Sequence, residues 1–311
     1  MSSCPQPSAA CPHPLTRAPR LPADDPAPWS RLYPAPPALQ GAIVAVLSRD
    51  TRSAALSDAQ RLSHFPASPL ISLSWFQEMD VGLVEPDVDG GRWVPFGKPV
   101  VISGSQSRPR VSWAPTTGRG GVMCFTPDVA RALFGLDLGA IHDRFVPAGT
   151  VLDARWHPFL DALARAPDDG TTLAVLEQHL APRWQALQGR SSATPSLRQL
   201  GRHWVERLAL QAREWRQTHS PRQVERRIKT FSGRSLREWQ ALVRTEGIFF
   251  AARERYENGR PFEWAALAQD EGFADQAHMS RESRRITGFA PTEFARRFIE
   301  DESFWMYRLW V

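Results

Sequence analysis

Short apolar runs, broken by proline and glycine, fill the chain from residue 38 to about residue 125. They are rich in Val, Ile, Trp and Phe, the residue types that favour extended backbone. The predicted strands are 71–76, 92–96, 98–104, 110–113 and 121–125. Because these runs follow one another closely, we expect antiparallel strands in a small barrel or sandwich.

Helical periodicity takes over from residue 126. Thr126, Pro127 and Asp128 form a typical helix start, with a capping side chain, a proline in the first turn and an acidic residue near the N-terminus. The later helical patterns are 157–165, 172–188, 197–217, 220–231, 235–256, 262–271, 275–286 and 291–300. The predicted fold class is therefore α+β, with a β-rich region followed by an all-α region.

Two segments without periodic apolar positions divide the chain. Residues 1–37 hold 11 of the 27 prolines, so we expect a largely disordered leader stiffened by proline. Residues 189–196 are small and polar, which is typical of a linker. The predicted domains are 38–188, β-rich with trailing helices, and 197–311, all helical.

The helical region contains an internal repeat with an offset of 55 residues. Residues 220–239 align with residues 275–294, so that Arg226 pairs with Arg281. At 100° per residue, the first helix of each copy gathers apolar side chains on one edge and basic side chains on the opposite face. The chain therefore encodes one helical unit twice.

Both copies have residues that suit helix boundaries. Ser220 and Asp275 are predicted N-caps, and the amide groups of the first turn can then approach an anion. Gly233 and Gly288 are predicted to follow the helix ends in a left-handed conformation. Each helix also follows another helix and a tight turn, so the pattern predicts two helix-turn-helix units able to read successive segments of a DNA major groove.

The second copy carries the more specific motif, GFADQAHMSRESRRITGFAPTEF at 272–294. Its Gly-Phe pair, its histidine with an arginine three residues later, and its Gly-x-x-Pro-x-x-Phe ending resemble the signature of the AraC family of bacterial transcription regulators. The resemblance extends over residues 197–300, about a third of the chain. It implies a double helix-turn-helix DNA-binding domain, commonly joined to an N-terminal sensing or dimerising domain that is often a cupin-like barrel.

The same resemblance implies a set of DNA-binding residues. The base-reading positions would be Arg222, Glu225, Arg226, Gln276, His278 and Arg281. Their chemistry agrees, since Arg can grip guanine, Gln can pair with adenine and Glu can accept from cytosine. Lys229, Arg284 and Arg285 suit phosphate contacts, which set affinity rather than sequence preference.

One position departs from the family pattern. Ser283 stands where the family usually has an aromatic or aliphatic anchor. We therefore expect the second recognition helix to be loosely seated, and the substitution Ser283→Phe to raise the melting temperature.

The charge distribution agrees with a polyanionic partner. Residues 1–189 hold 16 basic and 17 acidic side chains, whereas residues 190–311 hold 22 and 16, so the positive excess lies in the C-terminal part. Only Lys98 and Lys229 are lysines, so arginine is the default cation of this chain. Plain solvated surface therefore remains the alternative for any one arginine.

Candidate chemistry in the β-rich region is sparse. His64, His142 and His157 are widely scattered, whereas a metal-dependent cupin enzyme needs clustered ligands, so we expect no metal and no cofactor. The sequence lacks phosphate-loop, nucleophile-elbow and zinc-deaminase motifs, so no enzymatic activity is expected.

Other apolar features are interpreted as structural. Cys124 lies in an apolar run, which suggests a buried thiol, and the three cysteines form neither a disulfide framework nor a zinc site. The tail 304–310 is expected to pack back onto its domain or across a dimer. Three tryptophans could line an apolar pocket, but a core role is favoured; they are Trp75, Trp93 and Trp113.

Together these features predict a cytoplasmic, sequence-specific DNA-binding transcription regulator controlled by a small ligand or by dimerisation. An activator role is expected, but the sequence does not distinguish activation from repression. Double-stranded DNA is the expected partner, while RNA polymerase, a small-molecule effector and a homodimer stay open. No membrane span is expected, because the longest near-candidate, 41–48, is only strand-sized. No signal peptide is expected, because the N-terminus lacks a basic start followed by an apolar stretch. The alternative is a small-molecule-binding protein or cupin-type enzyme whose C-terminal helices dock a protein.

Overall fold

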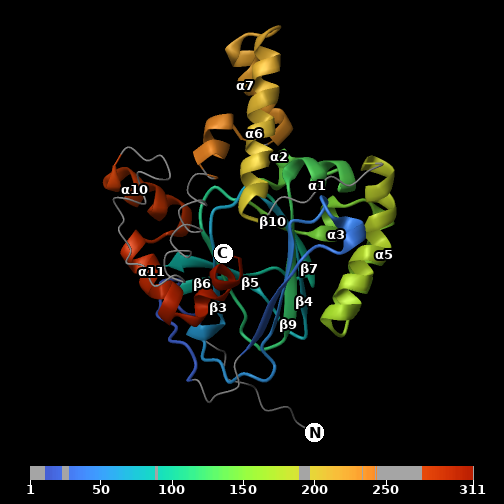
Figure 1. The fold of residues 1–311 in the computed structure, drawn as a ribbon. Helices are drawn as coiled ribbons and strands as arrows, with labels where there is room; N and C mark the ends of the chain where they lie inside the picture. Colours follow the sequence, from blue (N-terminus) through green and yellow to red (C-terminus); the bar gives the residue numbers. More distant parts are fainter. Residues whose placement is uncertain are drawn as a thin grey trace.

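The computed structural model describes residues 11–22, 28–87, 90–188, 197–232, 234–241, 243 and 275–310. Strands occupy the N-terminal part of the chain and helices follow, which confirms the predicted α+β fold class. Helices α6 (Leu197–Arg216) and α7 (Pro221–Ser232) project from one end of the molecule (Figure 1). Helices α10 (Gln276–Thr287) and α11 (Pro291–Glu300) lie on the flank of the β-rich region (Figure 1).

The strands of the described residues form two antiparallel sheets. The larger sheet has the order β1 (Trp29–Tyr33), β2 (Ala45–Asp50), β9 (Arg119–Phe125), β4 (Ile71–Gln77), β7 (Val100–Ser103) and β10 (Phe145–Pro147). The smaller sheet has the order β3 (Leu62–Phe65), β8 (Arg110–Trp113), β5 (Gly82–Asp87) and β6 (Gly90–Pro95). Within the described ranges no strand ladder joins the two sheets, so the region is an open sandwich and not a closed barrel.

Strand β4, in the larger sheet, shows how the sequence assigns two different faces. Side chains alternate along a strand, and Ile71, Leu73 and Trp75 are almost fully buried in the main core. Ser72 and Ser74 point the other way, into the space between the two sheets. The alternation therefore makes a solid core on one face and leaves room for a cavity on the other.

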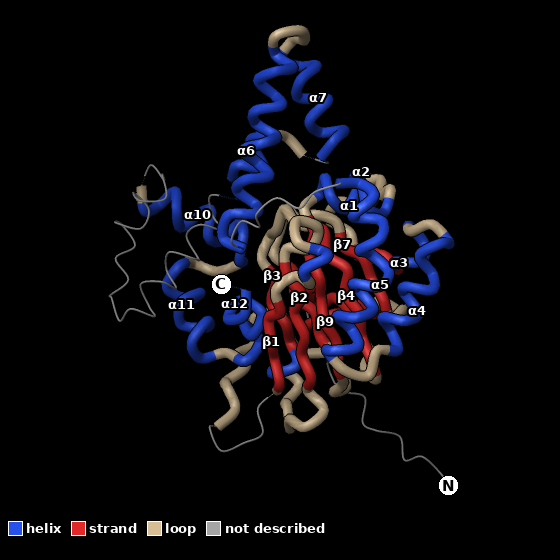
Figure 2. The backbone as a smooth tube through the Cα atoms, turned by 45° about the vertical axis from the view of Figure 1, so that its right-hand side comes forward, coloured by secondary structure: helices blue, strands red, loops and turns tan. Residues whose placement is uncertain are grey.

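Helices cover the outer face of the larger sheet (Figure 2). They are α1 (Pro127–Phe134), α2 (Leu138–Ile141), α3 (Ala148–Val151), α4 (His157–Arg165) and α5 (Asp169–Gln188). Short 3-10 helices occur at Pro37–Leu39, Ala59–Arg61 and Ala154–Trp156. Phe159 of α4 and Trp184 of α5 are buried in the same core as β4, so these helices seal that face.

A second core belongs to the helical region. Val205 and Leu208 of α6 pack with Val224 and Ile228 of α7, and Trp239 joins the same cluster. The cluster continues through α10 and α11 to a C-terminal segment, which comprises the 3-10 helix η4 (Glu302–Phe304) and α12 (Trp305–Trp310). The predicted helices 197–217, 220–231, 275–286 and 291–300 are confirmed within a few residues.

The expectation that residues 1–37 form a disordered leader is wrong for the part that the structure describes. Residues 29–33 form β1, which pairs with β2 along its whole length. Residues 15–20 lie against the C-terminal helices, where Ala18 is fully buried. The prolines stiffen this part of the backbone. They do not prevent it from packing, and residues 15–20 and 29–33 form hydrogen bonds with partners far away in the sequence.

The predicted strands can be compared with the observed ones, and some other predictions fall outside the described residues. All five strands predicted between residues 71 and 125 are present, as β4, β6, β7, β8 and β9. Strand β2 falls on the strand-sized apolar run 41–48, and β1, β3, β5 and β10 were not predicted. The linker 189–196, the helix 262–271, Gly233 and the second half of the helix 235–256 lie outside the described residues. Among the described helices, none is long and apolar enough to span a bilayer.

Candidate nucleic-acid interface and internal cavity

Helix α7 separates its apolar and charged side chains as predicted. Val224 and Ile228 are buried against α6. The four predicted DNA-binding residues of this helix fall within an arc of about 100° on the other side. All of them are exposed: Arg222, Glu225, Arg226 and Lys229.

The N-terminus of α7 is capped by its own side chains. Ser220 Oγ accepts from the backbone N–H of Gln223 at 3.4 Å, and Gln223 Oε1 accepts from the N–H of Ser220 at 2.9 Å. This reciprocal pair is a capping box. Lys229 is 3.3 Å from Glu225, but both side chains are more than half exposed, so the pair contributes little to stability. Its charges remain accessible to a partner.

Helix α10 is bounded by the two residues that the sequence indicated. Asp275 accepts a hydrogen bond from the N–H of His278 at 2.6 Å, and Gly288 ends the helix with φ 85°. Met279 and Ile286 are buried. Of the predicted DNA-binding residues, Gln276, Arg281 and Arg284 are exposed, while His278 and Arg285 are half-buried.

The basic residues of α10 form one face, and Gln276 lies apart from it. His278, Arg281, Arg284 and Arg285 span about 120° around the helix axis. Gln276 lies about 140° from Arg281, in the exposed first turn. Arg285 is held by Glu282 at 2.7 Å, whereas Arg281 and Arg284 form no ion pair with another described residue. These two cations are therefore available to an anion.

The expectation that Ser283 leaves α10 loosely seated is wrong. Ser283 is 1% exposed, and its hydroxyl donates to the backbone carbonyl of Phe289 at 3.0 Å. Thr287 Oγ1 in turn donates to the carbonyl of Ser283 at 2.7 Å. The small polar side chain therefore joins α10 to the turn that follows it and is enclosed by the protein.

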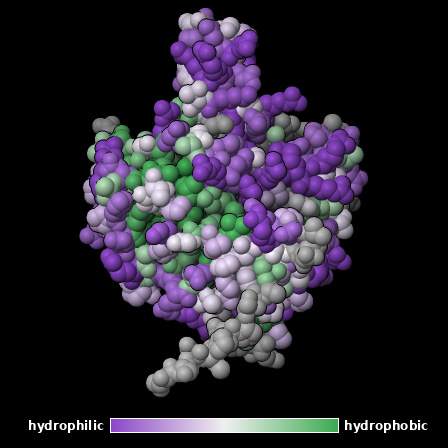
Figure 3. Space-filling model, turned by 180° about the vertical axis from the view of Figure 1, so that it is seen from behind, coloured by the Kyte–Doolittle hydropathy of each residue, from purple (hydrophilic) through white to green (hydrophobic). Residues whose placement is uncertain are grey.

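Helices α7 and α10 lie in different parts of the molecule. Both backbone views place α7 in the projecting lobe and α10 lower, beside the β-rich region (Figures 1 and 2). The lobe formed by α6 and α7 has a largely hydrophilic surface, while apolar side chains gather on the body below it (Figure 3). The two helices thus belong to separate surfaces, whereas the sequence predicted that they read successive segments of one groove.

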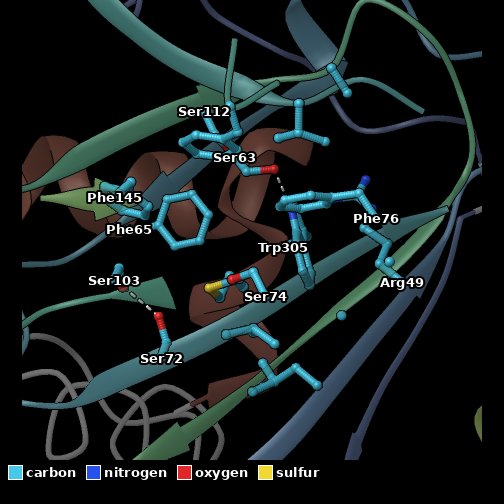
Figure 4. A pocket seen from close by; sticks show the side chains of 18 of the residues that line it. Arg49, Ser63, Phe65, Ser72, Ser74, Phe76, Ser103, Ser112, Phe145 and Trp305 are labelled. Atoms are coloured by element: carbon cyan, nitrogen blue, oxygen red, sulfur yellow. Dashed lines mark hydrogen bonds between the residues drawn. The ribbon is translucent and has the colours of Figure 1, made fainter. Parts of the chain in front are cut away.

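A cavity of about 190 Å³ lies between the two sheets and is closed on one side by the C-terminal segment (Figure 4). Aromatic side chains from several elements line it, including Phe65, Phe76 and Trp305. The cavity is larger than the roughly 150 Å³ that holds benzene in an engineered protein core. Its wall also carries hydroxyl groups, among them Ser72 and Ser103, which bond to each other at 2.6 Å. The cavity can therefore hold a mainly apolar molecule.

Two arginines bring positive charge to this apolar wall. Arg49 is 8% exposed and lies 2.8 Å from Glu302 of the C-terminal segment. Burial lowers the pKa of Arg49 to about 10, although Glu302 opposes this shift. The other is Arg61, which pairs with Asp58. The Nε atoms of both arginines are buried and have no hydrogen-bond partner among the described residues.

The tryptophans and histidines that the sequence analysis singled out lie outside this cavity, and the core interpretation is confirmed for two of those three tryptophans. Trp75 and Trp113 are at most 2% exposed. The half-buried Trp93 packs edge-on against Trp113. His64, His142 and His157 lie on separate elements, and the described residues hold no group of three or more metal-ligand side chains. Cys124 is buried in β9, as expected.

Comparison with known proteins gives a limited likeness. No family model matches the chain, and no curated protein matches it. A solved structure of ToxT from Vibrio cholerae is 11% identical, over 86% of this chain and 97% of that chain, with a TM-score of 0.37. A structure of ToxT with a bound unsaturated fatty acid is 12% identical, over 77% and 94% of the two chains, with a TM-score of 0.34. Neither family nor function follows from a likeness of this size.

Proposed function

We propose that this protein is a sequence-specific DNA-binding transcription regulator of the AraC type, controlled by a small molecule bound in its β-rich region. The observation that carries the proposal is helix α10, which is capped by Asp275 and exposes Arg281 and Arg284 on one face. A helix of this kind fits the B-DNA major groove, which is about 12 Å wide. The resemblance of residues 272–294 to the AraC signature supports the same conclusion.

The side chains divide between reading bases and holding phosphates. Arg281 is assigned to a guanine edge, because arginine can donate two hydrogen bonds to O6 and N7. Arg284 is assigned to the phosphate backbone. On α7, Arg222, Glu225 and Arg226 would read bases and Lys229 would hold a phosphate, and their exposure is compatible with these roles.

Half-buried residues have narrower roles in this proposal. Arg285 is already bound to Glu282 and reaches a phosphate only by giving up that partner. His278 lies in the first turn, where it can approach the backbone or a base edge. Gln276 is exposed beside it and remains a candidate for adenine.

The test begins by mapping the genomic DNA that the full-length protein binds and then measures affinity for one bound site over a range of salt concentrations. Contacts to six or more phosphates should give a slope of log K against log salt steeper than about −5. A protein-docking role for the helical region would give little slope and no preferred sequence. That result would exclude DNA recognition and favour the small-molecule-binding alternative.

A further inference from the structure

The C-terminal segment, residues 302–310, connects the proposed DNA-binding region to the cavity. Trp305 Nε1 donates to Ser63 Oγ of β3 at 2.8 Å, and Trp305 lines the cavity itself (Figure 4). Phe304 lies 4.8 Å from the ring of His64, also on β3. The segment therefore forms one wall of the cavity and joins it to the β-rich region.

Helix α10 is attached to the same wall. Ile286 lines the cavity, and its backbone carbonyl accepts from the N–H of Ala67 at 2.8 Å. Phe289, just beyond the helix, packs against His64 at 5.5 Å. The C-terminal end of the proposed recognition helix is thus in direct contact with the cavity wall.

The charged side chains of the cavity wall are cationic. Arg49 and Arg61 are the charged residues among its described lining residues, and their carboxylate partners, Glu302 and Asp58, do not line the cavity. Each arginine has a buried Nε–H without a partner among the described residues. Because an unpaired buried donor is costly, a ligand that accepts from these groups gains binding free energy.

Arg49 already has an internal anionic partner, and that partner belongs to the C-terminal segment. Glu302 Oε1 lies 2.8 Å from Arg49, and the Arg49 guanidinium stacks 4.6 Å above the Trp305 ring. Arg308 lies 3.4 Å from the other oxygen of Glu302. A displaced Glu302 would therefore keep one cationic neighbour, which makes its replacement at Arg49 feasible.

We propose that the cavity binds an apolar molecule ending in a carboxylate, and that this carboxylate displaces Glu302 from Arg49 and loosens the C-terminal segment. The apolar body occupies the space between the sheets, and the anionic end lies at Arg49. Loss of the Arg49–Glu302 contact weakens the attachment of α10 to the β-rich region, which frees α10 to adjust to DNA. This mechanism deepens the proposed function and depends on it only for the final step at DNA.

Ligand selectivity is tested by calorimetry on the full-length protein with decanoate and decan-1-ol as probes. Wild-type protein should bind decanoate at least about 10-fold more tightly than decan-1-ol, because only the carboxylate forms a charged hydrogen bond to Arg49. Arg49→Gln should abolish this preference and leave the affinity for decan-1-ol unchanged. Equal affinity of the wild type for the two probes would overturn the proposal.

Competition by Glu302 is tested with a matched pair of variants. Glu302→Gln should tighten decanoate binding about 10-fold, because the internal competitor loses its charge, and should not alter decan-1-ol binding. Glu300→Gln is the control, since Glu300 lies just ahead of this segment, at the end of α11, and pairs with Arg17 and not with Arg49. An unchanged decanoate affinity in Glu302→Gln would show that Glu302 does not compete, even if Arg49→Gln failed to fold.

Release of the segment is tested by hydrogen exchange. Decanoate, but not decan-1-ol, should speed amide exchange in residues 302–310 and 284–289. Slower exchange in these residues with decanoate would overturn the release step. None of these assays contains DNA, so a negative result in them would not contradict the DNA-binding proposal. If the protein failed to bind DNA, these assays would still test the ligand proposal.

Discussion

Arg281 and Arg284 lie three residues apart on α10, and both are exposed. Arg281→Ala should cost roughly 1–3 kcal/mol of binding free energy and relax the preference at one base position. Arg284→Ala should weaken all sequences alike and reduce the salt slope by about 1. Affinity measurements on a site and its single-base variants would check this division, and identical profiles for the two variants would refute it.

Ser283 gives a prediction opposite to the one drawn from the family pattern. It is 1% exposed and bonded to the carbonyl of Phe289. Ser283→Phe should therefore destabilise the protein by about 1–3 kcal/mol through overpacking. Ser283→Ala, which only removes the hydrogen bond, should cost about 1 kcal/mol. Thermal unfolding compares the two, and a phenylalanine variant more stable than the alanine variant would restore the idea of a loose seat.

The stability of helix α10 depends on its N-cap residue, Asp275. Asp275→Ala should cost about 1 kcal/mol, because the N–H of His278 loses its acceptor. Asp275→Asn keeps a capping oxygen and should cost much less, while it removes the charge that opposes a phosphate. Hydrogen exchange over residues 276–281 measures the difference. If both substitutions had the same effect, the charge and not the hydrogen bond would account for the stability.

The elements differ in how visible they are in the sequence. Strands such as β4 and β7 are rich in β-branched and aromatic residues and were predicted, whereas β10 has only three residues and ends in Pro147. β1 was missed because it follows a proline-rich stretch. The cavity was also invisible, because Ser72 and Ser74 look like ordinary polar positions until β4 is paired on both sides. The recognition faces were visible because they depend on local helical spacing.

Long-range pairings at the scale of the whole molecule have no local signal. Arg49 and Glu302 are 253 residues apart in the sequence, and neither lies in a motif. The sequence predicted that the tail packs back onto the protein, and the structure confirms this. Only the folded structure shows that the C-terminal segment reaches the cavity and that Glu302 pairs with Arg49 there. The proposed control of α10 by the cavity follows from this pairing and not from the family resemblance.

Residues 15–20 of the leader contact helix α11 and Asp301, near the other end of the chain. Arg17 lies 3.3 Å from Glu293, 2.5 Å from Glu300 and 3.5 Å from Asp301. Its neighbours Leu15 and Thr16 accept hydrogen bonds from the buried Arg297. Because Arg17 is itself partly exposed, Arg17→Ala should cost only about 1 kcal/mol, but it should speed amide exchange in both residues 15–20 and residues 291–301.

A matched control for this leader contact is Arg52→Ala. Arg52 is also exposed and ion-paired, but its partners are Asp50 and Glu78, within the β-rich region. Its removal should leave exchange in residues 291–301 unchanged. Equal effects of the two substitutions would mean that the leader does not fasten α11. An effect of Arg17→Ala alone would show that the residues ahead of β1 hold the helical region in place, so truncating them should also alter how α10 is released.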